Sequence, residues 1–190
     1  MSGQRPRARI VLATAAEIAS HSGGPTLDLL CRLRSGIDQL GEVAPDVLLD
    51  RAAVAHTDAV ALENLFGTWF STVVAQMAAV LAGRFDEALH WSDVGLVAVA
   101  RSGRTHAPMQ LELRGNILAL LRRDEEALRL YAAAQAHNDR AGVPWPALEM
   151  TGPLLQRTRT VVAVDRADHL RREGARLTVR DLAPAGRADT

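Results

Sequence analysis

Two stretches of the chain carry the same residues at a fixed offset of 39 positions. The motif Arg-x-x-Glu-Ala-Leu occurs at residues 84–89 and again at 123–128, and Arg-x-Gly occurs at 101–103 and again at 140–142. A fixed offset of this kind is typical of helical repeat arrays, in which each unit buries its apolar face against the next. The repeat therefore predicts an all-α fold, a helical-repeat α-solenoid with about nine helices and antiparallel neighbours.

The later copy, residues 111–142, resembles the tetratricopeptide repeat. Its small and aromatic residues stand at the family's spacings: Gly115, Ala127, Tyr131 and Ala134. Gly115 and Ala127 lack bulk, so two helix axes can approach closely, and Tyr131 would fill the adjoining gap. The earlier copy has Gln76 and Ser92 in place of Gly115 and Tyr131. We expect a degenerate tetratricopeptide-like superhelix, and two unrelated helical hairpins are the alternative.

Helix start and stop signals divide the chain into further elements. Expected helices span residues 9–20, 25–40, 45–65, 84–103 and 124–141, one begins at Thr105, and two follow at 154–164 and 165–173. We expect buried residues in the third helix at Leu48, Leu49, Ala52, Ala53, Val60 and Leu65. The predicted organisation is an N-terminal segment and first helix over 1–24, a tetratricopeptide-like domain over 25–183 and a disordered tail over 184–190.

One stretch of about 20 residues, 64–83, has no charged side chain and matches a membrane span in length. The equivalent helix one repeat later carries Glu112, Arg114 and Asn116, which favours a central helix of an all-α array covered by its neighbours. The first 24 residues lack the long uncharged core of a signal peptide. Cys31, the single cysteine, is expected to be a buried apolar residue in a reducing compartment. These features predict a cytoplasmic protein with no membrane partner.

The order of motifs resembles the C-terminal region of bacterial LuxR-type and adenylate-cyclase-linked signal-transduction ATPases. The matching segments are the Glu-Ala-Leu at 126–128, the Ala run at 132–134, Arg-x-Gly-x-Pro-x-Pro at 140–146 and Glu-Gly-Ala-Arg-Leu-Thr-Val at 173–179. Those ATPases bind phosphates with a Gly-x-x-x-x-Gly-Lys-Ser/Thr loop, whereas this chain has no lysine. The resemblance therefore implies the scaffold of a transcriptional regulator without its ATPase or helix-turn-helix, joined to an upstream domain or protein partner.

No catalytic or metal-binding pattern appears in the sequence. The six histidines have no close ligand spacing, and we expect each of them to lie on a solvated helix surface. The formal net charge is zero at pH 7, and the arginines of residues 157–180 alternate with acids and have no aromatic neighbour to stack on a base. We therefore expect a protein that is not an enzyme, has no cofactor and does not bind nucleic acid.

Two functions of different class fit a helical repeat array. The first is protein–protein interaction and regulation, for which the polar positions of the first helix in each repeat are the candidate partner-binding residues: Gln76, Gln110, Arg114 and Asn116. Gln110 and Arg114 could equally do no more than solvate one side of a core helix. The second function is sensing of a small-molecule effector, which would require a pocket lined by Trp69, Trp91 and Met109.

The N-terminal helix has an apolar face with no partner before it in the sequence. Its apolar residues are Ile10, Val11, Leu12 and Ile18. Repeat arrays need polar caps at their ends, and the charged stretch 165–176 supplies one at the other end. We expect the first helix to be loosely held and to leave an exposed apolar patch, filled by another chain or by the upstream part of a longer protein.

Overall fold

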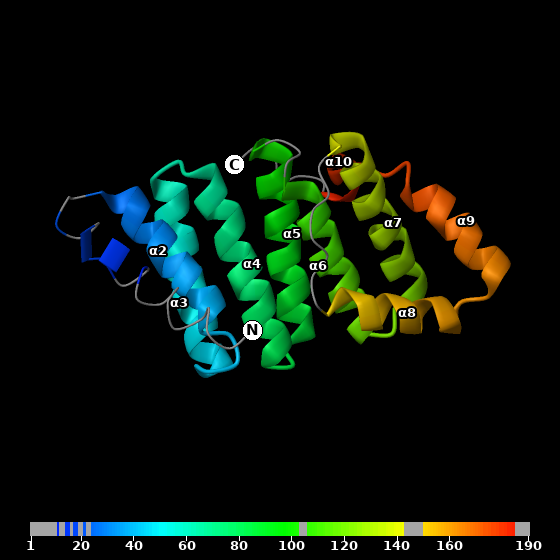
Figure 1. Cartoon of the computed structure of the whole chain (residues 1–190), viewed down its shortest axis with the longest axis horizontal. Helices are drawn as coiled ribbons and strands as arrows, with labels where there is room; N and C mark the ends of the chain where they lie inside the picture. The colour runs from blue at the N-terminus through cyan, green and yellow to red at the C-terminus, as the bar shows by residue number, and fades with distance from the viewer. Residues whose placement is uncertain are drawn as a thin grey trace. The chain divides into compact units, whose positions relative to one another are not determined.

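The computed structural model describes residues 11, 14–15, 17–18, 21, 24–102, 106–142 and 150–184. Within these ranges the chain forms helices joined by turns and contains no strand (Figure 1). The bounded helices are α2 (Pro25–Asp38), α3 (Pro45–Ala61), α4 (Leu65–Leu81), α5 (Phe85–Ser102), α6 (Ala107–Leu120), α7 (Asp124–Ala141), α8 (Thr151–Val161), α9 (Val164–Gly174) and α10 (Val179–Leu182). For the described part of the chain, the predicted all-α fold with about nine helices is confirmed.

Most predicted helix bounds agree with the structure to within a few residues. The third helix ends at Ala61 rather than at residue 65, and the helix expected from residue 154 begins at Thr151. Most of the predicted first helix, the break at residues 143–149 and the tail beyond residue 184 lie outside the described residues. Of the N-terminal apolar residues, Val11 and Ile18 are described and both are exposed.

The chain divides into two compact units, Met1–Ala88 and Leu89–Thr190, and the division falls within α5. In the first unit α3 and α4 form a tightly packed antiparallel hairpin, and α2 packs against both. Gly67 of α4 lies where the three helices meet, because a Cβ at this position would approach Leu29 of α2 to 2.9 Å and Ala59 of α3 to 3.2 Å. The core of this unit is therefore made of small and branched residues that let the helices approach closely.

In the second unit α6 and α7 form the central hairpin, and α8 and α9 pack against it. Gly115 of α6 faces the ring of Tyr131 of α7 so closely that a Cβ would lie 2.8 Å from Cε1 of the ring. Gly174, at the end of α9, lies directly against the backbone carbonyl oxygen of Arg129 in α7. The predicted contact between Gly115 and Tyr131 is thus present.

Three interhelical turns share one hydrogen-bond pattern. Glu63, Gly83 and Arg122 each have positive φ, at 51°, 72° and 63°. The N–H of the next residue donates to the carbonyl oxygen five positions earlier, at 2.9 Å in each turn: Asn64 to Ala59, Arg84 to Ala79 and Arg123 to Leu118. This is the Schellman motif that ends a helix. Gly83 and Arg122 are 39 positions apart, which is the offset of the sequence repeat. The two copies of the repeat therefore share the same turn.

The repeated Arg-x-x-Glu motif also forms the same contact in both copies. Arg84 Nε lies 2.6 Å from Glu87 Oε2, and Arg123 Nε lies 2.7 Å from Glu126 Oε1. Each pair sits at the first turn of a helix, where a carboxylate favours the positive end of the helix dipole. The motif therefore acts as a helix-start signal.

Several sequence expectations about individual side chains were wrong. Val60 and Leu65, expected to be buried, are about half exposed, whereas Ala55 and Ala59 complete the buried face of α3. Glu125 and Arg129, which are four positions apart on α7, form ion pairs with α9 instead: Glu125 with Arg166 at 2.6 Å and Arg129 with Glu173 at 3.1 Å. Tertiary packing decides both outcomes, because it sets which face of a helix is covered.

The apolar stretch that matched a membrane span in length forms α4, and most of its residues are buried. None of the described helices combines the length and the apolar character that a membrane span requires. Cys31 is buried, as expected.

Three histidines depart from the expected solvated positions. His137 is buried, His106 is partly buried, and His56 of α3 is partly covered by α4. The Nδ1 atom of His56 lies 2.9 Å from Ser71 Oγ and 3.2 Å from the carbonyl oxygen of Thr68. Burial lowers the pKa of His56 below its ordinary value, and the Thr68 carbonyl opposes this shift in part.

A glycine-to-alanine pair tests the close approach of α6 and α7. Gly115→Ala forces a methyl group against the buried ring of Tyr131, and we expect it to lower the free energy of unfolding by about 1–3 kcal/mol. Gly152→Ala, in α8, has no atom within 4 Å of the new methyl group and should raise stability by about 0.5 kcal/mol. Urea unfolding followed by circular dichroism measures both. Equal effects of the two substitutions would contradict the packing described here.

The lowered pKa of His56 makes stability depend on pH. In the unfolded chain His56 binds a proton near pH 6.5, whereas in the folded chain it binds one only at lower pH. The free energy of unfolding should therefore fall as the pH drops below about 7. Burial lowers the pKa of His106 as well, so His106 also contributes to the wild-type slope. Urea midpoints measured from pH 7.5 to 5.5 should show a smaller decline for His56→Gln than for wild type. His90→Gln, at an exposed position, is the control, and an equal reduction of the slope by His90→Gln would contradict the assignment to the burial of His56.

Candidate binding groove between α2 and α3

Three of the four predicted partner-binding residues lie inside the protein. Gln76 and Gln110 are fully buried and Asn116 is 1% exposed. Gln76 Nε2 donates to the carbonyl oxygen of Thr72 at 3.1 Å, and Gln110 Nε2 donates to the carbonyl oxygen of Ser92 at 3.1 Å. The prediction that these three side chains line a partner-binding surface is wrong for the folded chain, because their polar groups are used inside it.

Asn116 is the centre of a buried hydrogen-bond chain in the second unit. Its Oδ1 accepts from the hydroxyl of Tyr131 at 2.9 Å, and its Nδ2 donates to Thr151 Oγ1 at 2.9 Å. Burial raises the pKa of the Tyr131 phenol, with a further contribution from the charge of Glu112. These contacts join α6, α7 and the start of α8, so Asn116 has a structural role.

Arg114 is the one predicted residue that remains partly exposed. Its Nη1 atom lies 2.6 Å from Asp93 Oδ1, and the two side chains are 21% and 31% exposed. The ion pair connects α6 to α5 on a partly solvated surface. Arg114 therefore stays available as a rim contact, but the three residues predicted with it do not form a site around it.

The three residues expected to line an effector pocket, Trp69, Trp91 and Met109, do not form a common pocket with the groove described below. Trp69 is buried and packs against Phe66 and Phe70 on its own helix, with ring centroids 5.6 and 5.9 Å apart. Trp91 and Met109 are partly buried in the second unit. None of the three lines the groove between α2 and α3 that is described below.

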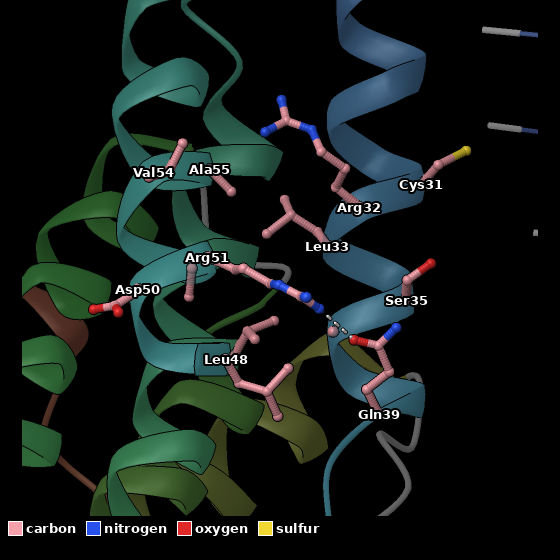
Figure 2. A pocket seen from close by; sticks show the side chains of 13 residues that line it. Cys31, Arg32, Leu33, Ser35, Gln39, Leu48, Asp50, Arg51, Val54 and Ala55 are labelled. Carbon is pink, nitrogen blue, oxygen red and sulfur yellow. Dashed lines mark hydrogen bonds between the residues drawn. The ribbon is translucent and has the colours of Figure 1, made fainter. Parts of the chain in front are cut away.

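A groove of about 460 Å³ lies between α2 and α3 in the first unit, with Val74 of α4 beneath it (Figure 2). Its floor is apolar and small: Leu33, Gly36, Leu48, Ala52, Ala55 and Val74. Val54 stands at the rim and is 58% exposed. α3 shares far more of its surface with α4 than with α2. The floor residues Leu33, Leu48, Ala52, Ala55 and Val74 are themselves at most 3% exposed.

Two polar bridges cross the gap between α2 and α3. Near one end, Arg32 of α2 lies 2.8 Å from Asp58 of α3 and 2.9 Å from Asp28 of its own helix. Near the other, Arg51 Nη1 donates to the amide oxygen of Gln39 at 2.9 Å. Figure 2 shows the Arg51 side chain reaching across the groove from α3 to Gln39, the residue that follows α2. The partners that bridge the gap are seven residues apart on each helix, which places the bridges about 10 Å from each other.

The two arginines differ in their charge balance. Arg32 has two carboxylate partners, whereas Arg51 bonds to the neutral amide of Gln39 among the described residues. Asp50 also belongs to the lining, but its carboxylate points away from α2 in Figure 2. The groove therefore combines an apolar floor with one cation that has no carboxylate partner in the described structure.

Sequence reasoning missed this groove although a partial signal existed. Val47, Arg51 and Val54 recur at i, i+4 and i+7 on one face of α3, and the two valines are exposed. That pattern identifies a face with apolar and cationic character. It does not reveal that α2 leaves the face partly open, because the spacing of two helices depends on three-dimensional packing.

The described part of the chain contains no group of three or more His, Cys, Asp or Glu side chains placed to hold a metal ion. A second cavity of about 270 Å³ lies in the second unit between α7, α8 and α9, where Arg159 and Arg171 stand beside Tyr131 and Asp139. Its charges of both signs give no preference for one class of ligand. We therefore take the groove between α2 and α3 as the candidate functional site.

No family model, curated protein or solved structure matches the chain. The resemblance to tetratricopeptide repeats and to LuxR-type ATPase regulators therefore remains a prediction from the sequence.

A pair of substitutions separates the interior role of Asn116 from the surface role of Arg114. Asn116→Ala removes the partner of the buried Tyr131 hydroxyl, and we expect it to lower the free energy of unfolding by about 1–3 kcal/mol. Arg114→Ala removes a partly solvated ion pair and should lower it by less than about 1 kcal/mol. Urea unfolding monitored by circular dichroism gives both values. A larger loss for Arg114→Ala would contradict these assignments.

Proposed function

We propose that the chain is a non-catalytic helical-repeat module for protein–protein interaction and regulation. Its tetratricopeptide-like character is supported by the close contact of Gly115 with Tyr131 and by the matching turns at Gly83 and Arg122. The resemblance to the C-terminal region of LuxR-type and adenylate-cyclase-linked ATPase regulators supports a scaffold role in transcription regulation in the cytoplasm. An upstream domain or a separate protein would then be the partner.

The observation that carries this proposal is the uneven distribution of exposed apolar side chains. Of the twelve large hydrophobic side chains exposed in the described residues, ten belong to the first unit and two to the second. The exceptions are Val161 and Val164. Clusters of exposed apolar residues on one part of a soluble domain are typical of interaction surfaces. The interaction surface proposed here is the exposed face of α3, which carries Val47, Val54 and Val60.

Site-specific photo-crosslinking tests the interaction surface. A photoreactive residue at Val54 should form a defined adduct with the partner in cells, and one at Val161, on the second unit, is the matched exposed control. The partner, once identified, should form a complex of fixed stoichiometry with the purified chain, and Val54→Glu should abolish it by burying a charge at the contact. Equal crosslinking at both positions, or a complex insensitive to Val54→Glu, would contradict this surface.

Sensing of a small-molecule effector is the second candidate function, and the groove between α2 and α3 favours it. Its volume of about 460 Å³ falls within the range of about 300–1,000 Å³ typical of ligand sites, and its lining is mainly apolar with a few polar groups. Thermal-shift measurement with candidate metabolites tests this function. A ligand present at 100 times its dissociation constant should stabilise the fold by about 2.7 kcal/mol. The bound ligand should also change the affinity for the protein partner, as regulation requires.

A further inference from the structure

We propose that the chain self-associates through its N-terminal segment, where a helical stripe formed by Val11 and Ile18 packs antiparallel against the same stripe of a second copy. This N-terminal stripe is separate in sequence from the exposed face of α3, and the contact goes beyond the proposed interaction function. The occupant of the exposed apolar patch at the N-terminus is therefore a second molecule of the same chain.

The N-terminal stripe is helical, apolar and exposed. Between residues 11 and 21, the described positions 11, 14, 15, 17, 18 and 21 all have helical conformation. Val11 and Ile18 are seven residues apart, which places them on one side of a helix, and they are 62% and 58% exposed. Large aliphatic side chains aligned and exposed in this way are typical of a helix face that packs against another chain.

The spacing of the helices identifies the role of this segment in the fold. When the helices are taken in consecutive pairs from α2 onward, the second members α3, α5, α7 and α9 begin 40, 39 and 40 residues apart. The eleventh residue of each second member is small and buried: Ala55, Gly95, Ala134 and Gly174. A further step of 40 residues from Ala55 towards the N-terminus reaches Ala15, which lies between Val11 and Ile18 on the same side of the helix. The N-terminal segment therefore corresponds to the second helix of such a pair.

The residues of α3 that correspond to the N-terminal stripe hold a neighbouring helix. They are Arg51, which donates to the amide oxygen of Gln39 at 2.9 Å, and Asp58, which lies 2.8 Å from Arg32 of α2. This side of a second helix is thus the side that faces another helix. In the N-terminal segment both positions are aliphatic, so the helix that packs there must present an apolar side as well.

A second copy of the N-terminal stripe supplies such a side. In an antiparallel pair related by a two-fold axis, Val11 of each chain lies opposite Ile18 of the other, so the stripe is complementary to itself. Thr14 and Ala15 then lie at the axis, where their small side chains allow the two helices to approach closely.

The charges of the segment favour the antiparallel direction. Three arginines precede Val11, at positions 5, 7 and 9, and Glu17 is the first acidic residue of the chain. Antiparallel pairing places the basic end of one segment beside the end of the other that carries Glu17, whereas parallel pairing would bring the two basic ends together. The opposed dipoles of antiparallel helices act in the same sense.

Sedimentation equilibrium of the full chain tests the self-association. Wild type should form a concentration-dependent dimer. Val11→Glu and Ile18→Glu should each weaken this dimer about 10-fold or more, because each places a charge in the apolar contact. Val164→Glu is the matched control, since Val164 is 73% exposed and belongs to the second unit, and it should leave the dimer unchanged.

Cysteine crosslinking tests the direction of the pair. Thr14→Cys places the new thiols of the two copies next to each other at the axis, so oxidation should join them. His21→Cys is the matched exposed control, because the two thiols would lie about 20 Å apart in an antiparallel pair and should not join. Both variants retain Cys31, which is buried.

Three results would overturn the proposal. The first is a chain that stays monomeric at every concentration measured, which would leave the stripe to an upstream domain or to another protein. The second is a dimer that Val164→Glu weakens as much as Val11→Glu does. The third is crosslinking of His21→Cys as readily as of Thr14→Cys, which would show a different direction of pairing.

Discussion

The close approach of helices at glycine and alanine positions is the interaction on which the described structure depends. In the first unit Gly67 lets α4 lie against Leu29 of α2 and Ala59 of α3, and in the second unit Gly115 lets α6 lie against the ring of Tyr131. Dense packing of this kind leaves no room for even one additional methyl group. It also fixes which faces of the remaining helices are left uncovered, and hence where a partner or ligand can bind.

The groove between α2 and α3 follows from this uneven packing. α3 is covered by α4 along its length, whereas α2 contacts α3 over a smaller surface and is joined to it by polar bridges at Arg32 and Arg51. Exposed ion pairs and hydrogen bonds contribute little stability compared with apolar burial. Opening such bridges would leave the core contacts between α3 and α4 intact.

The sequence predicted the elements of the fold more successfully than the site. The repeated motif at residues 84–89 and 123–128 marked two helix starts correctly, because the signal is local: an arginine, a turn and an acidic first helical turn. Burial of polar side chains is not local. Gln110 and Asn116 were predicted to lie on a partner-binding surface, yet both are buried. The amide of Gln110 bonds to a group 18 residues away, and the amide of Asn116 bonds to a group 35 residues away. The groove depends on the spacing of two helices, which no local pattern specifies.

Hydrogen exchange of backbone amides, read by mass spectrometry on the full chain without ligand, tests the central claim that α2 is the weakly packed side of a rigid α3–α4 hairpin. Exchange reports local opening, which is easiest where few apolar contacts hold an element. The account predicts that amides in the middle of α2 exchange at least 10-fold faster than those in the middle of α4. Equal protection of α2 and α4 would contradict it, since the two helices would then open together and the groove would be part of a single cooperative core.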